Sequence, residues 1–127
     1  MRVPRPWLAI AGVALAVVSS VSNVGATEYT SVHTEDAIYR AHMDTGVNYD
    51  TLRHIVGCET GWTFNPYAEG DGGHSHGAAQ LNDYGNAIGA FYRAGYTDPY
   101  NPYEAVYFMA ESLRGDHPPL GRRTWNC

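Results

Sequence analysis

The sequence predicts a mainly helical α+β domain in which helices surround one glycine-rich excursion. Apolar residues recur at helical spacing in four segments, two before residues 60–80 and two after them. Four glycines lie between positions 70 and 77, which disfavours a regular helix there and predicts a loop or a short β-hairpin. A chain of 127 residues suffices for one domain.

The N-terminus has the pattern of a secretory signal peptide over residues 1–26. Arg2 and Arg5 precede an apolar run at residues 7–18, and residues 24–26 supply small side chains for a cleavage site. The run of twelve residues is shorter than the roughly 20 needed to span a bilayer, so we expect no stable membrane insertion after cleavage. An uncleaved anchor or a buried helix is the alternative interpretation.

The chain after this leader is acidic. Residues 27–127 hold six arginines, no lysine and thirteen acidic residues, which gives a formal charge of −7. Nucleic acid and anionic lipid both attract proteins through clustered basic side chains, and the only dense basic pair is Arg122-Arg123. We therefore expect neither nucleic acid nor a lipid surface as a partner.

Cys58 and Cys127 are the only cysteines of the chain. An even cysteine count in an exported protein predicts a disulfide, and two free thiols are the alternative. Closing a loop of about 70 residues stabilises a fold by about 4 kcal/mol in the chain-entropy model. Export also predicts a secreted or cell-wall-associated protein.

The first two helices are predicted from capping residues and apolar spacing. Residues 27–33 are expected to form a short arm, and Thr34 to begin a helix that ends at Gly46. Asp50 is the expected cap of the second helix. The second helix carries a stripe of apolar residues at helical spacing: Leu52, Ile55 and Val56.

The last two helices follow the glycine-rich residues. One is expected to begin at Asp83 and to end at Gly95. The other combines Asn101 as N-cap, Pro102 at the first helical position and Glu104 at the third, which predicts a capping box. Its apolar stripe comprises Val106, Met109, Ala110 and Leu113.

Glu59 extends the apolar stripe of the second helix by one step. Burial disfavours the charged form of a carboxylate, and the negative end of a helix dipole acts in the same direction, so both effects raise its pKa. A carboxylic acid that stays protonated near neutral pH is what general acid catalysis requires. Trp62 and Phe64 are the expected apolar wall beside it. A carboxylate that simply points into water is the alternative.

Several motifs, taken in order, resemble the soluble lytic transglycosylases and their relatives. Residues 58–61 (CETG) are similar to the catalytic Glu-Ser segment of that family, and Asn65-Pro66 follows at the family's distance. Residues 76–82 (HGAAQLN) are similar to its Gly-Leu-Met-Gln-Ile segment, and residues 98–101 resemble the start of the helix behind the cleft. Residues 125–127 (WNC) resemble the resuscitation-promoting factors, which are small secreted lysozyme-like domains with a disulfide.

The resemblance implies a lysozyme-like domain over residues 48–127, preceded by an arm and helix over residues 27–47. It implies cleavage of the β-1,4 bond between N-acetylmuramic acid and N-acetylglucosamine in peptidoglycan glycan strands, without a cofactor. Glu59 would protonate the glycosidic oxygen, and in a lytic transglycosylase it would then act as base while the muramyl 6-hydroxyl closes a 1,6-anhydro ring. A hydrolase would use a second carboxylate, for which Glu69 and Asp71 are the candidates.

The same resemblance implies residues that bind substrate. Gln80 matches the Gln of the second segment, Ser75 takes the small hydroxyl position before it, and Tyr107 matches an aromatic residue of the later helix. Trp62, in the loop after Glu59, is a further candidate for stacking on a sugar, while packing in the core is the alternative for Tyr107. The family's later Ala-Tyr-Asn motif has no good copy here, so lyase and hydrolase chemistry both stay open.

Two other functions compete with this prediction. His74 and His76, with Asp71 or Glu69, are candidate zinc ligands, but a histidine pair two positions apart is a weak signal without further ligands in pattern, so we expect no metal. The other competitor is a lysozyme-like module that binds glycan without cleaving it. Glu59 argues against it, because a pure binder needs no acid on an apolar stripe. By default we expect a monomer.

Overall fold

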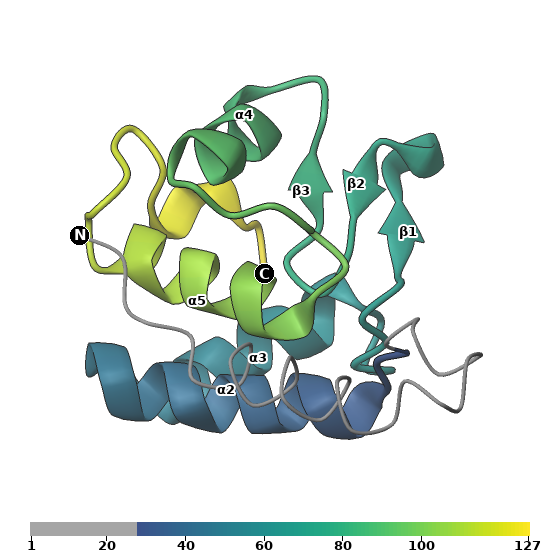
Figure 1. Cartoon of the computed structure of the whole chain (residues 1–127), viewed down its shortest axis with the longest axis vertical. Coiled ribbons are helices and arrows are strands. Elements are labelled where there is room, and N and C mark those ends of the chain that lie inside the picture. Colours follow the sequence, from purple (N-terminus) through teal and green to yellow (C-terminus); the bar gives the residue numbers. More distant parts are fainter. Residues whose placement is uncertain (1–27) are drawn as a thin grey trace, which may run out of the picture.

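The computed structural model describes residues 28–127 (Figure 1), so the expected signal peptide at residues 1–26 lies outside the described residues. The elements in chain order are α2 (Ser31–Thr45), α3 (Tyr49–Glu59), β1 (Glu69–Gly70), η2 (Asp71–Gly73), β2 (Ser75–His76), β3 (Leu81–Asn82), α4 (Asn86–Arg93), α5 (Pro102–Leu113) and η3 (Arg122–Thr124). Helices and a small antiparallel sheet confirm the α+β class. Among residues 28–127, no helix is both long and apolar enough to cross a membrane.

The glycine-rich excursion forms a short three-stranded antiparallel sheet in the order β1-β2-β3. Glu69 pairs with His76 in the first ladder, and Ser75 pairs with Asn82 in the second. Figure 1 shows the sheet on one side of the molecule, with α2 and α3 below α5 and with α4 above it. The predicted loop or hairpin is therefore a three-stranded meander.

The first two helices begin earlier than predicted. Helix α2 begins at Ser31 instead of Thr34, because Thr30 is the N-cap and its N–H donates to His33 Nδ1 at 3.0 Å. Helix α3 is capped by Asn48, whose side chain accepts from the Thr51 N–H at 2.9 Å. Asp50 instead lies in the first turn, where its negative charge interacts favourably with the positive end of the helix dipole and stabilises the helix.

The predicted capping box of α5 is wrong in one half. Asn101 is the N-cap, and its Oδ1 accepts from the Tyr103 N–H at 3.0 Å. Glu104 does not reach back to the cap; its Oε1 accepts from the N–H groups of Thr97 at 2.7 Å and Asp98 at 3.1 Å. The Asn101 N–H already donates to the Asp98 carbonyl, so Glu104 is free to hold the preceding loop.

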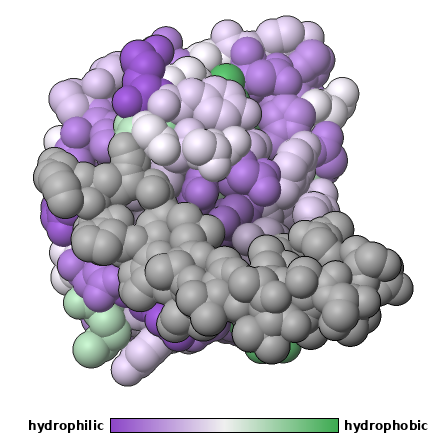
Figure 2. Space-filling view, viewed as in Figure 1, coloured by the Kyte–Doolittle hydropathy of each residue, from purple (hydrophilic) through white to green (hydrophobic). Residues whose placement is uncertain are grey.

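The core lies around α5, whose residues 102–112 are all buried. One face of α2 packs against it, and two tyrosine hydroxyls of α5 donate to carboxylates of α2, Tyr103 to Asp36 and Tyr107 to Asp44. The buried apolar residues of the other helices are Ala37, Ile38, Ala41, Leu52, Ile55, Val56, Ala87 and Phe91. Outside the grey residues, the face seen in Figure 2 is mainly hydrophilic, in keeping with the acidic composition.

Gly77 is expected to tolerate no side chain. Its φ is 81°, and a Cβ at this position would overlap the Pro99 carbonyl oxygen. We expect Gly77→Ala to lower the free energy of unfolding by about 3 kcal/mol or more, measured by urea denaturation. Gly46 has nearly the same φ, 79°, but open space around it, so Gly46→Ala should cost only about 1 kcal/mol. Equal losses in the two variants would contradict the steric explanation.

Candidate active site

Glu59 is the last residue of α3, one turn beyond the fully buried Val56. Its side chain is half-buried, and burial raises the pKa of the carboxyl above its ordinary value, while the positive charge of Arg122 opposes this shift. Desolvation therefore outweighs the attraction of the guanidinium, as expected for a group set into a protein wall. A carboxyl in this setting can hold a proton at a higher pH than an exposed glutamic acid.

The wall beside Glu59 is the predicted disulfide. Cys58 and Cys127 are bonded, with their Cα atoms 5.9 Å apart, and Cys127 Sγ lies 3.3 Å from Glu59 Oε2. A disulfide sulfur carries no hydrogen, so this contact donates nothing to the carboxylate and places a weakly polar atom against one of its oxygens. The bridge therefore closes the chain and is also one of the groups packed against the half-buried carboxyl.

The C-terminal tail is fastened in place by hydrogen bonds. Trp125 is buried, and its Nε1–H donates to the Ala79 carbonyl at 2.7 Å. Arg122 donates to the carbonyl oxygens of Trp125 and Cys127, which orders the tail beside Glu59. In the sequence, Arg122 stands out only as a basic residue. Its place beside Glu59 follows from the disulfide, which brings the tail to the end of α3.

Thr60 closes the end of α3 next to the acid. Its hydroxyl donates to the Val56 carbonyl at 2.9 Å and accepts from the Phe64 N–H, also at 2.9 Å. The two bonds tie the helix to the loop that follows. The hydroxyl next to Glu59 therefore orders the backbone around the acid.

Trp62 lies on a different side of α3 from the acid. Its ring covers Gly57, where a Cβ would overlap the indole, and contacts His54 edge-on at 5.7 Å between ring centroids. Positions 57 and 59 of a helix are about 200° apart around its axis, so the disulfide, and not the indole, forms the wall of Glu59. Trp62 keeps 54% of its surface exposed, and sugar stacking by this ring stays a prediction.

The residues chosen by resemblance make contacts within the fold. Gln80 donates through Nε2 to the carbonyls of Ala68 at 3.0 Å and Gly77 at 2.9 Å, and the buried Ser75 hydroxyl lies 3.1 Å from Asn82 Nδ2, which donates to it. Both side chains brace the sheet. Tyr107 is 2% exposed and lies between α5 and α2, so it has almost no surface to offer a substrate.

The two candidate second carboxylates lie at the sheet. The exposed Glu69 accepts from the Tyr100 hydroxyl and from His76 Nδ1, the latter at 3.0 Å, and these bonds lower its pKa. Asp71 Oδ2 accepts from Asn82 Nδ2 at 2.8 Å. The pKa of Glu69 is thus shifted down by its hydrogen bonds, whereas that of Glu59 is shifted up by burial.

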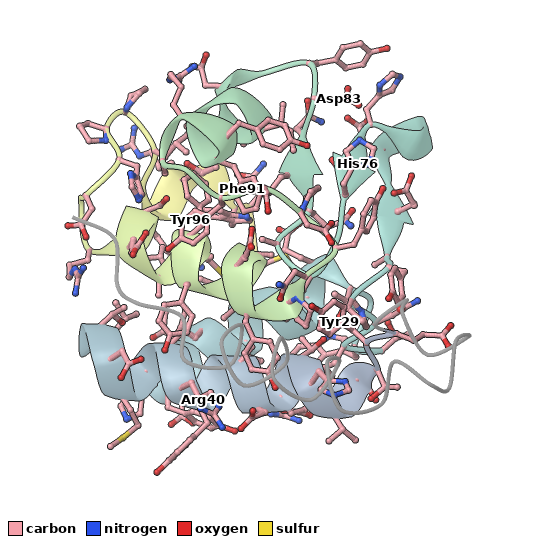
Figure 3. The ribbon with its side chains drawn as sticks, in the orientation of Figure 1. Tyr29, Arg40, His76, Asp83, Phe91 and Tyr96 are labelled. Atoms are coloured by element: carbon pink, nitrogen blue, oxygen red, sulfur yellow. A yellow bond between two sulfur atoms is a disulfide. The ribbon has the colours of Figure 1, made fainter. Side chains whose placement is uncertain are left out.

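His76 is held between two carboxylates. Its Nε2 lies 2.8 Å from Asp83 Oδ2 and its Nδ1 3.0 Å from Glu69 Oε2, while Asp83 also binds His74 at 2.9 Å. Figure 3 shows His76 and Asp83 together at the sheet. Asp83 therefore precedes α4 and does not begin it as predicted, because its side chain is engaged by the two histidines.

His74 and His76 each bind a carboxylate of the sheet region. Within residues 28–127, no group of three or more His, Cys, Asp or Glu side chains is placed to hold a metal ion. Acceptors at both ring nitrogens of His76 favour the imidazolium form, and the bonds to Asp83 and then Glu69 raise its pKa. The zinc alternative gains no support from this geometry.

The His76 ion pair leads to a pH prediction. Because the folded-state pKa of His76 is raised above its ordinary 6.5, its contribution to stability is present below that value and is lost as pH rises through the folded-state pKa. Asp83→Asn should move the His76 pKa back towards 6.5 in an NMR titration, whereas Asp71→Asn, which removes a partner of Asn82, should leave it unchanged. Equal His76 titration curves in the wild type and Asp83→Asn would refute the assignment.

Comparison of the chain with protein-family models, with curated proteins and with solved structures finds no match. A function therefore has to be inferred from the residues themselves. Two groups of residues are candidates for a functional site. One is Glu59 with its disulfide wall, and the other comprises the carboxylates and histidines of the sheet.

Proposed function

We propose that this protein is a secreted or cell-wall-associated glycosidase that cleaves the MurNAc–GlcNAc β-1,4 bond of peptidoglycan, with Glu59 as general acid and base. The observation that carries the proposal is the half-buried Glu59 carboxyl, set at the end of α3 against the Cys58–Cys127 disulfide. The sequence resemblance to lytic transglycosylases supports the substrate. A lysozyme-like arrangement, with the helices and the small sheet on either side of a glycan cleft, is part of the proposal.

In the favoured reaction Glu59 acts twice. Its carboxyl donates the proton to the glycosidic oxygen, and the bond from C1 of the muramyl residue to that oxygen breaks with the electron pair leaving on the oxygen. The Glu59 carboxylate then takes the proton of the muramyl 6-hydroxyl, whose oxygen bonds to C1 and closes the 1,6-anhydro ring. No water is consumed, and Glu59 ends protonated as it began.

A hydrolytic reaction is the second candidate. The lowered pKa of Glu69 is the observation that favours it. Its bonds to Tyr100 and His76 keep it in the charged form, as a nucleophile or a base that activates water requires. The products separate the two reactions: a lytic transglycosylase leaves 1,6-anhydro ends, and a hydrolase leaves reducing ends.

The test is digestion of purified peptidoglycan by the protein without residues 1–26, followed by mass spectrometry of the soluble fragments. We expect disaccharide-containing fragments with 1,6-anhydro ends, each lighter by one water than its reducing counterpart. Reducing ends would replace the favoured reaction by the hydrolytic one. Failure to release any glycan fragment would overturn the proposed activity.

A further inference from the structure

A concave site lies between the sheet, α4 and the segment that precedes α5. The pocket has a volume of about 340 Å³, within the range of about 300–1,000 Å³ that small-molecule sites occupy. Glu59 is not among its lining residues, which are His76, Asp83, Ile88, Tyr92, Pro99 and Tyr100.

The walls of the pocket combine apolar and aromatic surfaces. Ile88 and Pro99 supply aliphatic surface, and Tyr92, half-exposed on α4, supplies an aromatic ring. Tyr67 stacks on Tyr100 with ring centroids 6.0 Å apart and 26° between their planes. Ligands with one flat apolar face and a polar edge suit walls of this kind.

The carboxylate that lines the pocket already has hydrogen-bond partners. Both carboxylate oxygens of Asp83 are engaged, one by His76 and one by His74, and no arginine of residues 28–127 lines the pocket. A site for an anion would need an uncompensated cation, and a site for a cation would need a carboxylate without partners. The pocket therefore suits a neutral ligand that exchanges hydrogen bonds.

We propose that this pocket binds a sugar ring of a glycan strand. A pyranose has an apolar C–H face that packs on a tyrosine ring, and its hydroxyls both donate and accept at its edge. This inference rests on the proposed glycan substrate, and it adds an anchoring site away from the bond that is cleaved.

The pocket and Glu59 share one structural connection. His76 lines the pocket, and three residues later the carbonyl of Ala79 accepts from Trp125, two residues before the cysteine that touches Glu59. A glycan strand anchored at the pocket would therefore be held by residues 76–79, the same segment that fixes Trp125 and the tail beside Glu59.

The experiment measures binding without cleavage. Glu59→Gln protein is titrated with the tetrasaccharide of β-1,4-linked N-acetylglucosamine by isothermal calorimetry, and Tyr92→Ala is added to the same background. We expect the dissociation constant to rise about 10-fold in the Tyr92→Ala variant, with Tyr92→Phe close to the parent. The matched control is Tyr39→Ala, because Tyr39 is 55% exposed on α2. This substitution should leave binding unchanged.

Each outcome bears on the pocket separately from the activity. Loss of affinity in Tyr92→Ala but not in Tyr39→Ala, together with shifts of the His76 ring signals on titration, would support the pocket. Unchanged affinity in Tyr92→Ala, or no binding by the parent, would overturn it. Because the experiment measures binding, its result tests the pocket even if the wild-type protein releases no peptidoglycan fragments. Absence of fragments would overturn only the proposed activity.

Discussion

Glu59→Gln is expected to lower the rate of peptidoglycan cleavage by about 100- to 10,000-fold, the usual contribution of a general acid or base. The amide keeps the size and hydrogen-bonding edge of the side chain, but it has no acidic proton to transfer to the glycosidic oxygen. The measurement is the initial rate of fragment release from purified peptidoglycan. Glu28→Gln makes the same chemical change at an exposed position and should keep the wild-type rate.

The pH dependence of the wild-type protein follows from the same residue. Because burial raises the pKa of Glu59 above 4.5, the acid stays protonated to a higher pH than an exposed glutamic acid, and the rate should fall as pH rises through the raised pKa. The same shift makes the contribution of Glu59 to stability largest below 4.5 and lost through the raised pKa. Glu59→Gln should therefore remove this titration without unfolding the protein at neutral pH.

One set of results would favour a binding module over an enzyme as the function of this protein. If Glu59→Gln and the wild type release fragments at the same rate, Glu59 is not the acid. If neither releases fragments but both bind the glycan, the chain is a non-catalytic binder of the same fold. Circular dichroism of both proteins shows that the comparison is made between folded chains.

Replacing both Cys58 and Cys127 by Ser is expected to lower the free energy of unfolding by about 4 kcal/mol. The disulfide closes a loop across 69 positions, and its loss frees the unfolded chain. Domains of this size are stable by only about 5–15 kcal/mol in total, so the melting temperature should fall by roughly 15–30 °C. Calorimetry with and without a reducing agent measures both values.

The same double variant should also change the acid. Without the bridge, the sulfur that lies 3.3 Å from Glu59 Oε2 no longer shields the carboxyl, and water regains access to it. The pKa of Glu59 should then move back towards 4.5, so the fall of the rate should occur at a lower pH. A pH profile identical to that of the wild type, in a variant that is still folded, would show that the bridge does not set the pKa.

Reducing agent supplies the control for the disulfide. It should lower the melting temperature of the wild type to that of the double variant and leave the double variant unchanged. If the double variant melts at the wild-type temperature, the tail is held by other contacts, such as the Trp125 bond to Ala79, and the entropic estimate is wrong for this fold.

Local patterns in the sequence predicted the helices well, because caps and apolar spacing act over a few residues. Asn101 and Pro102 mark the start of α5 as predicted, and the stripe through Leu52, Ile55 and Val56 is buried. Starts were missed by a few residues where two capping residues competed, as with Asn48 and Asp50.

Partners distant in the chain could not be predicted in this way. Tyr107 meets Asp44 across two helices, and His76 meets Glu69 and Asp83 only because three short strands pair. Nothing in the local sequence distinguishes these contacts from other pairings of the same residue types. The pocket proposed to bind a sugar depends on such contacts throughout.

Two features of this protein were determined by its sequence alone: the α+β class, set by helical periodicity around a run of glycines, and the one possible disulfide pairing, since the chain has only two cysteines. The sequence also singled out Glu59, as a carboxylate on an apolar stripe. Only the tertiary structure decided what surrounds that carboxylate. The sulfur of Cys127 and the charge of Arg122 reach it from the far end of the chain, and a pKa depends on neighbours in space, which local sequence does not specify.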